Sequence, residues 1–160
     1  MAKVAPLRTD TDGLGLGMMS TDIGTQLPDN LFDQLSNANP PEQSCKAIPI
    51  CTVDGDGWAH PALLSYGEVE VKNRSTLRVV TFNGTKTTAN LRMNGRLTIL
   101  FVDDTMTYYV KGTAHEVPGP QADEGLGYAY MDVMIAHILS DAPGAGEEGA
   151  IITSGIIFKW

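Results

Sequence analysis

Between residues 46 and 117, short runs of hydrophobic, β-branched and aromatic residues are separated by polar turns, a pattern that is typical of β-strands. Asp54–Gly57 and Asn73–Ser75 are two of these turns. The predicted strands are 46–53, 58–65, 67–72, 76–82, 96–102 and 106–117. Many short strands joined by tight turns predict an antiparallel sheet closed into a small barrel.

Two short segments have a helical pattern instead. Residues 28–37 place Leu31, Phe32 and Leu35 on one face, which predicts a helix that Asn39-Pro40-Pro41 brings to an end. Residues 88–94 predict a second helix, with Gly95 as the glycine that follows a helix end.

The stretch 122–140 carries apolar residues at spacings of three and four, which predict a third, amphipathic helix. Its apolar face would contain Leu126, Tyr130, Val133, Met134 and Ile138. A loop at 144–149 and a last strand at 151–160 follow. The fold class predicted is therefore mainly β: an antiparallel split β-barrel of about six or seven strands with two or three flanking helices.

The chain is predicted to hold one domain at 27–160, preceded by an N-terminal tail or arm at 1–26. The arm contains a Gly-Leu-Gly-Leu-Gly run at 13–17, but no predicted strand precedes it, so a dinucleotide-binding fingerprint is not expected.

Composition narrows the class of protein. Of the 160 residues 42% are hydrophobic and 19% charged, and the net charge is −8, so we expect a globular protein that binds neither nucleic acid nor anionic membranes. No apolar run is long enough for a membrane span, and MAKVAPLRTD lacks the apolar core of a signal peptide. We therefore expect a cytoplasmic protein, in which Cys45 and Cys51 are buried free thiols rather than a disulfide or zinc pair.

The segment 77–91, LRVVTFNGTKTTANL, is the most informative part of the chain. It predicts a strand, an Asn83-Gly84 turn and a helix start rich in hydroxyls, with Lys86 among them. A helix N-terminus has unpaired N–H groups and a partial positive charge, so these residues suit a phosphate. Equally, Thr85 or Thr87 can be a plain N-cap, and the residues alone leave both interpretations open.

This segment and its surroundings resemble the FMN-binding split-barrel family, also called the pyridoxamine 5′-phosphate oxidase-like family. The resemblance covers residues 47–117 well and the last strand weakly. It rests on Thr81, then Thr85-Lys86-Thr87, Asn90-Leu91, Asn94-Gly95 and the strand YYVKGTAHEV that begins at Tyr108.

The resemblance implies an FMN cofactor and assigns it ten residues. Those implied for the phosphate are Thr85, Lys86, Thr87 and Thr88. Those implied beside the isoalloxazine are Val80, Thr81 and Phe82 on one side, Leu64 and Ser65 on the other, and Thr107, which would point a polar group towards the flavin. It also implies a homodimer with the cofactor sites at the interface and an oxidoreductase activity on an unidentified small molecule.

Two departures from the family pattern qualify that expectation. The family's phosphate site has two basic side chains, whereas this sequence has Lys86 and then Thr87; Arg92 or Arg96 could compensate or be plain surface charges. True pyridoxamine phosphate oxidases continue past the last strand with a substrate-binding Arg and His, whereas this sequence ends at IIFKW. Oxidation of vitamin B6 is therefore not expected.

No side chain stands out as catalytic. His60, His115 and His137 have no ligand-spaced neighbours, so no metal site is expected, and no nucleophile motif is present. The leading hypothesis is a flavin-dependent oxidoreductase, in which the cofactor carries the redox chemistry. The alternatives are a non-catalytic flavin binder, a deazaflavin or haem protein with His60 or His115 as axial ligand, and a dimeric structural protein without a cofactor.

Overall fold

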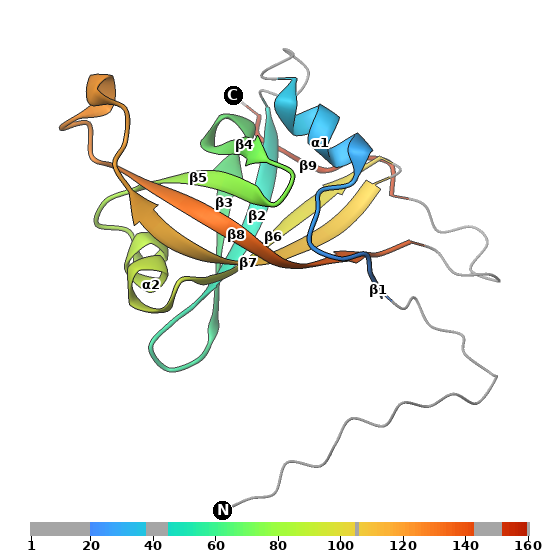
Figure 1. Cartoon of the computed structure of the whole chain (residues 1–160), viewed down its shortest axis with the longest axis horizontal. Coiled ribbons are helices and arrows are strands. Elements are labelled where there is room, and N and C mark those ends of the chain that lie inside the picture. Colours follow the sequence, from blue (N-terminus) through green and yellow to red (C-terminus); the bar gives the residue numbers. More distant parts are fainter. Residues whose placement is uncertain (1–19, 38–44, 105, 143–151, 160) are drawn as a thin grey trace, which may run out of the picture.

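The computed structural model describes residues 20–37, 45–104, 106–142 and 152–159. In this part of the chain one antiparallel sheet curls around the core, with two α-helices against it (Figure 1). In chain order the elements are β1 (Thr21–Asp22), α1 (Asp29–Ser36), β2 (Lys46–Val53), β3 (Ala59–Ser65), the 3-10 turn η1 (Tyr66–Glu68), β4 (Val69–Asn73), β5 (Thr76–Phe82), α2 (Lys86–Asn94), β6 (Arg96–Asp103), β7 (Met106–Val117), the 3-10 turn η2 (Gln121–Asp123), β8 (Tyr128–Ser140) and β9 (Ile156–Ile157).

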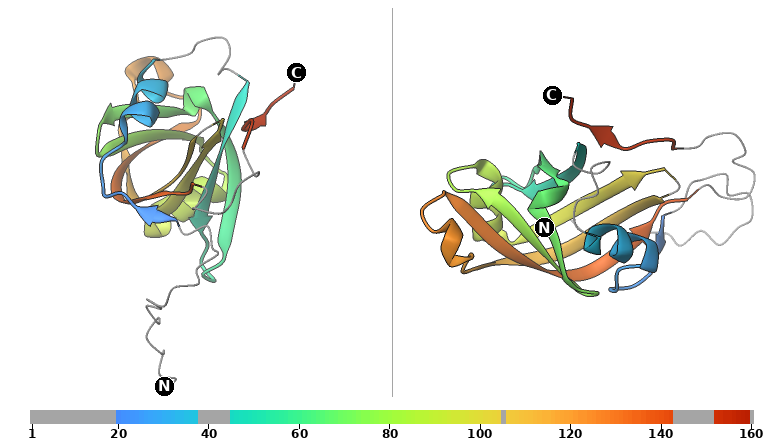
Figure 2. Two further views of the ribbon diagram at one scale, coloured as in Figure 1. Left: turned by 90° about the vertical axis from the view of Figure 1, so that its right-hand side faces the viewer. Right: turned by 90° about the horizontal axis from the view of Figure 1, so that it is seen from above.

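The sheet has the strand order β3-β2-β6-β7-β8-β5-β4, and every pairing in it is antiparallel. Its two ends, β3 and β4, are adjacent in the chain through η1, so the sheet curls back towards its own beginning (Figure 2). The two-residue strands β1 and β9 add to β8 and β2. This architecture is the mainly β split barrel that the sequence predicts.

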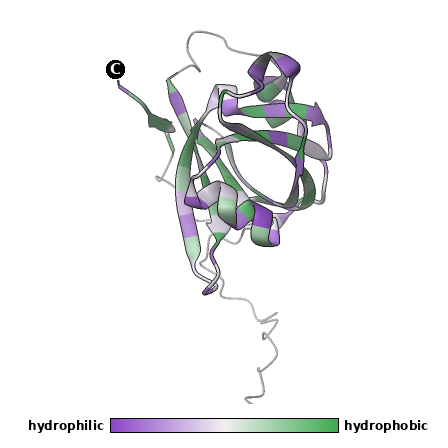
Figure 3. Cartoon of the chain, turned by 90° about the vertical axis from the view of Figure 1, so that its left-hand side faces the viewer, coloured by the Kyte–Doolittle hydropathy of each residue, from purple (hydrophilic) through white to green (hydrophobic). Residues whose placement is uncertain are grey.

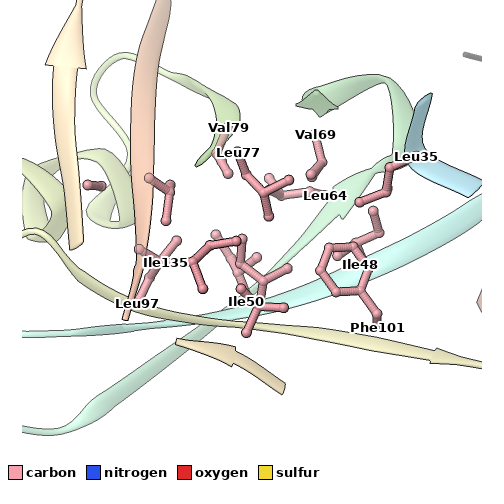
Figure 4. Close-up of a cluster of buried hydrophobic side chains, with 14 of the residues drawn as sticks. Leu35, Ile48, Ile50, Leu64, Val69, Leu77, Val79, Leu97, Phe101 and Ile135 are labelled. Carbon is pink, nitrogen blue, oxygen red and sulfur yellow. The ribbon is translucent and has the colours of Figure 1, made fainter. Parts of the chain in front are cut away.

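The core follows from the period of two along the strands. Buried residues alternate with more exposed ones along β5, β6 and β8 of the curled sheet, which Figure 3 colours by hydropathy, and the inward set forms one continuous cluster. Ile48, Ile50, Leu77, Val79 and Phe101 lie in this cluster (Figure 4), and each is at most 2% exposed. Burial of this apolar surface is the main force that keeps the sheet curled.

Helix α1 covers one end of the core beside β4. Leu31 and Leu35 are its buried residues. Arg74 from the β4–β5 turn lies over the Phe32 ring at 4.4 Å and forms an ion pair with Asp29 at 2.8 Å. The helix is thus fixed by apolar burial together with a cation–π contact, as the amphipathic pattern of 28–37 predicts.

Helix α2 lies at the other end of the barrel (Figure 1). In the chain it follows β5 and precedes β6. Asn90, which is 1% exposed, donates to the Thr52 hydroxyl at 3.0 Å and ties the helix to β2. Gly95 ends the helix in the left-handed region, with φ 68°, and a Cβ there would lie 2.6 Å from the Ala114 carbonyl oxygen. Only glycine suits both conditions.

Most of the predicted elements are confirmed with small shifts in their ends. The predicted strands at 46–53, 76–82 and 106–117 match β2, β5 and β7. The strand predicted at 67–72 begins later, at Val69, because η1 occupies residues 66–68. Within the described residues the last predicted strand is reduced to β9, while its ends at 151 and 160, the loop at 144–149 and the prolines at 40–41 lie outside them.

The helix predicted over 122–140 is wrong, because these residues form η2 and the long strand β8. Ala129, Met131, Val133 and Ile135 are buried with the period of a strand. The pairing with β7 then shifts in register between Lys111 and Gly112, because β8 contains one extra residue after Ile135. The next buried residue of β8 is Ile138. This β-bulge breaks the alternation after Ile135. Leu126 and Met134, which the sequence assigns to the apolar helix face, are 59% and 61% exposed.

Candidate functional site

The turn from β5 into α2 is held by a closed set of hydrogen bonds. Thr85 caps the helix: its Oγ1 accepts from the Thr88 N–H at 3.2 Å and donates to the Phe82 carbonyl at 2.9 Å. The Thr88 hydroxyl donates to the same carbonyl at 2.7 Å and lies 2.7 Å from the Thr81 hydroxyl. The N-cap interpretation of Thr85 is therefore confirmed, and the hydroxyls of Thr81, Thr85 and Thr88 stabilise the turn itself.

The donors that remain at the start of α2 suit an anion. Within the described residues, the Lys86 and Thr87 N–H groups have no acceptor, as expected in the first turn of a helix. The Lys86 side chain is exposed and forms no ion pair with any described residue. Thr87 is 6% exposed, and its hydroxyl likewise has no partner in the described part of the chain. Two amides, one ammonium and one hydroxyl at a helix N-terminus fit a phosphate.

Arg92 is not a second free cation for that phosphate. It donates to both carboxylate oxygens of Glu116, at 2.7 and 2.6 Å, and to the Asn83 side-chain oxygen at 2.6 Å. Its hydrogen bonds hold the pKa of the Glu116 carboxyl below its usual value. Arg92 therefore stabilises the Asn83-Gly84 turn through its hydrogen bond to Asn83. Arg96 is exposed and forms no ion pair with a described residue.

An open groove of about 770 Å³ lies on the outer face of β5 and β8, next to this turn. We call it the β5–β8 groove. Ser65, Val80 and Phe82 line it, so three residues implied for the flavin by the family resemblance share one surface. Tyr128 and Tyr130 of β8, which pair with Phe82 and Val80, line the same groove. Two neighbouring strands thus form one part of its surface, and the segment 65–70 and Phe158 also line it.

Two of the other implied residues point into the barrel instead. Leu64 is 5% exposed and belongs to the hydrophobic core, and Thr81 is 3% exposed. Alternation along β3 and β5 places these side chains opposite the groove. Only their backbone groups can contact a ligand on the outer face.

Thr107 lies far from α2 within one chain. It is 8% exposed on β7 and pairs with Val102, near the end of the β6–β7 hairpin. The opposite end of that hairpin, where Arg96 pairs with Thr113, is the end that adjoins α2. One chain therefore does not bring Thr107 to the helix start.

The histidines are dispersed. His60 is half-buried opposite Thr52 on β2, and His115 is exposed opposite Asp132 on β8. His137 lies on β8, not on a helix as the sequence predicts, and its Nδ1 is 3.2 Å from Asp22 Oδ2. Among the described residues no group of three His, Cys, Asp or Glu side chains could hold a metal ion. Cys45 and Cys51 are both half-buried.

Sequence reasoning missed the β8 side of the groove because it assigned that segment to a helix. The Tyr130 hydroxyl donates to the Asp123 carboxylate, and this hydrogen bond raises the pKa of Tyr130 to about 12. Gly125 and Gly127 both have positive φ, 83° and 81°, which no helix accommodates. These glycines, followed by the alternating Tyr128 and Tyr130, were the available signal for a strand.

Comparison with known proteins identifies the family. The family model described as "Pyridoxamine 5′-phosphate oxidase" matches residues 38–152, well over half of the chain. This chain belongs to the pyridoxamine 5′-phosphate oxidase family. Uncharacterized protein YclD of Bacillus subtilis (strain 168) is 32% identical over 85 residues, 53% of this chain and 55% of YclD. The match thus spans about half the length of that curated relative.

Solved structures of the same fold accompany this match. A protein from Lactobacillus delbrueckii, described as a candidate pyridoxamine 5′-phosphate oxidase, has a TM-score of 0.58 at 15% identity, over 75% of this chain and 98% of the other. An FMN-binding protein from Syntrophomonas wolfei has a TM-score of 0.51 at 20% identity, over 68% and 82%. At these identities the likeness shows the fold, which is the split barrel predicted for the family.

The described part of this family member contains no helix that is both long and apolar enough to cross a membrane.

Proposed function

We propose that this member of the pyridoxamine 5′-phosphate oxidase family binds FMN and acts as a flavin-dependent oxidoreductase. The observation that carries the proposal is the free donor set at the start of α2: the Lys86 ammonium and the Lys86 and Thr87 amides. Thr87 adds a buried hydroxyl. These groups would hold the phosphate, with the closed network of Thr81, Thr85 and Thr88 keeping the turn in shape.

The β5–β8 groove supplies the neighbouring surface. Val80 and Phe82 offer an apolar face, and Ser65 offers a hydroxyl that is already bonded to Glu68 at 2.9 Å. When bound, FMN would supply hydride transfer, and the chain's residues would bind and orient it. Glu68, Glu70 and Asp123 also line the groove, and they would repel a phosphorylated vitamin. We therefore propose a substrate other than pyridoxamine 5′-phosphate.

We further propose a cytoplasmic homodimer. The exposed apolar side chains of Leu63 on β3 and of Ile156 and Ile157 on β9 are 49–56% exposed, and Trp58 at the β2–β3 turn is 74% exposed. Apolar strand surfaces of this kind favour pairing with a second copy. A partner chain would also supply the Thr107 that one chain keeps away from its own α2.

The test is the visible absorption spectrum of the purified protein before and after addition of FMN and desalting. We expect a retained flavin band, and we expect Lys86→Gln to weaken FMN binding about tenfold through loss of one charged hydrogen bond. Lys111→Gln removes an exposed lysine on β7 and serves as the matched control. Undiminished FMN affinity in Lys86→Gln would contradict the proposed phosphate site.

One observation favours a second candidate, a non-catalytic flavin binder. Among the ten implied residues Lys86 alone has a titratable side chain, so the set offers no general acid or base. Turnover of NADH or NADPH with an electron acceptor separates the candidates, because a flavin store would show none. A Soret band instead of a flavin band would identify a haem protein and direct attention to His60 and His115.

A further inference from the structure

The β5–β8 groove presents aromatic rings to solvent. Phe82 is 51% exposed and Tyr128 37% exposed, and their ring centroids lie 5.1 Å apart at an interplanar angle of 41°. Leu126, at 59% exposed, borders them. Exposed aromatic faces carry negative quadrupole charge and leave apolar surface in water, so they favour a ligand that is both apolar and cationic.

Three carboxylates line the same groove: Glu68, Glu70 and Asp123. None of the described residues that line it is a lysine or arginine. On the neighbouring strands, Arg78 is engaged in a bidentate ion pair with Asp132 at 2.7 and 3.1 Å. Lys72 lies 3.5 Å from Glu70 in an exposed pair, which holds it only weakly.

Two of these carboxylates are held in place by the fold. Glu68 accepts from the Ser65 N–H at 2.6 Å and from the Ser65 hydroxyl at 2.9 Å, which is the capping box of η1. Asp123 accepts from the Tyr130 hydroxyl. Each interaction fixes the orientation of an acid that faces the groove, so the acids need little reordering when a ligand binds.

We propose that the β5–β8 groove binds an organic cation with a planar or apolar body, such as a protonated aromatic amine. The proposal rests on the flavin function above and names the substrate class of that site. Phe82 and Tyr128 would contact the ring and the cation, and Glu68, Glu70 and Asp123 would supply the opposite charge. The anion donors at Lys86 and the acidic groove thus divide the surface around Phe82 into an end for phosphate and an end for the cation.

The test is a titration of the full chain, with and without FMN, followed by amide NMR shifts. The probe is benzyltrimethylammonium, and benzenesulfonate is the anionic control with the same ring. We expect benzyltrimethylammonium, but not benzenesulfonate, to shift the amide signals of Phe82, Tyr128 and Tyr130. Binding of the cation should weaken at high salt. Glu70→Gln and Asp123→Asn should each weaken binding about two- to fivefold. Glu124→Gln, which removes the adjacent acid outside this groove, should have no effect.

The outcomes separate the two proposals. Equal affinity for both probes, or a Glu124→Gln effect as large as that of Asp123→Asn, overturns the cation site. Retention of FMN without any shift from benzyltrimethylammonium also overturns the cation site and leaves the flavin function intact. Binding of the cation by a chain that does not retain FMN overturns the assignment of the groove as a flavoenzyme substrate site. Circular dichroism of each variant verifies that the fold is retained.

Discussion

Single residues at the two ends of α2 do most to define the candidate site. Local chemistry made them predictable: Asn83-Gly84 is a turn in which Gly84 has φ 81°, and Gly95 follows the helix with φ 68°. Residue type also indicated an N-cap at Thr85 or Thr87, and the structure shows that it is Thr85. The occupation of the Thr88 hydroxyl by Phe82 could not be predicted, because it depends on the angle at which the helix leaves the strand.

Gly95 offers a test at this scale. Gly95→Ala should lower the free energy of unfolding by about 2 kcal/mol or more, because it adds left-handed strain and a Cβ that meets the Ala114 carbonyl oxygen at 2.6 Å. Urea denaturation measures the change. Gly55→Ala is the control, since its nearest atom would be 3.8 Å away. A Gly95 variant as stable as the Gly55 variant would contradict the requirement for glycine.

Thr85 can be tested with a conservative pair. Thr85→Ala should cost about 1 kcal/mol in the free energy of unfolding because the Thr88 N–H loses its acceptor. Thr85→Ser retains the hydroxyl and should recover most of this loss. Thermal denaturation measures the melting temperatures of both variants. Equal melting temperatures for Thr85→Ala and Thr85→Ser would show that the hydroxyl cap contributes nothing to stability.

At the scale of elements, sequence patterns succeeded where a strand has regular alternation and failed where a bulge interrupts it. β2, β5 and β7 were predicted with their ends because tight turns separate them from their neighbours. β8 was missed because its buried positions change phase after Ile135. Pairing with β7 and β5 determines that change, and such long-range contacts lie outside any local window. Because β8 was not predicted, the β5–β8 groove that it lines was not predicted either.

The pairing of β5 with β8 predicts a pH dependence. Arg78 faces Asp132 across these strands, and its hydrogen bonds hold the pKa of Asp132 below the usual 3.8. A lowered carboxyl pKa stabilises the fold above pH 3.8, and this contribution is lost as the pH falls below that value. Arg78→Gln should therefore cost about 1–2 kcal/mol in the free energy of unfolding at pH 7 and less at pH 3.

Chemical denaturation at both pH values measures this difference. Lys72→Gln, in an exposed pair with Glu70, is the control and should change stability little at either pH. A loss in Arg78→Gln that is the same at pH 7 and pH 3 would show that the stabilisation does not depend on ionised Asp132.

At the scale of the whole molecule, the strand order and the two helices produce an acidic barrel with apolar strand surfaces exposed at β3 and β9. The sequence predicts the barrel and the acidity, whereas the position of Thr107 at the far end of the β6–β7 hairpin emerges only from the complete fold. In the proposed homodimer, a site completed by Thr107 would need two chains, which would connect cofactor binding to assembly.

This connection can be tested by placing a charge on β3. Leu63→Glu should convert the proposed dimer into a monomer and reduce FMN retention at the same time, because a charge opposes burial of that surface. Met134→Glu, at a residue 61% exposed on β8, is the matched control and should leave both unchanged. Analytical ultracentrifugation gives the mass. A monomeric variant with full FMN retention would separate cofactor binding from the second chain.

The β-bulge of β8 also bears on how relatives of this protein diverge. Deletion or insertion of one residue within the regular part of β8, from Tyr128 to Ile135, would exchange the interior for the surface for every side chain on one side of the change. Gly112 itself has no room for a Cβ, which would lie 2.6 Å from Val133. Single-residue insertions and deletions should therefore be rare in this stretch over evolutionary time, while the loops on either side of β8 remain free to vary in length.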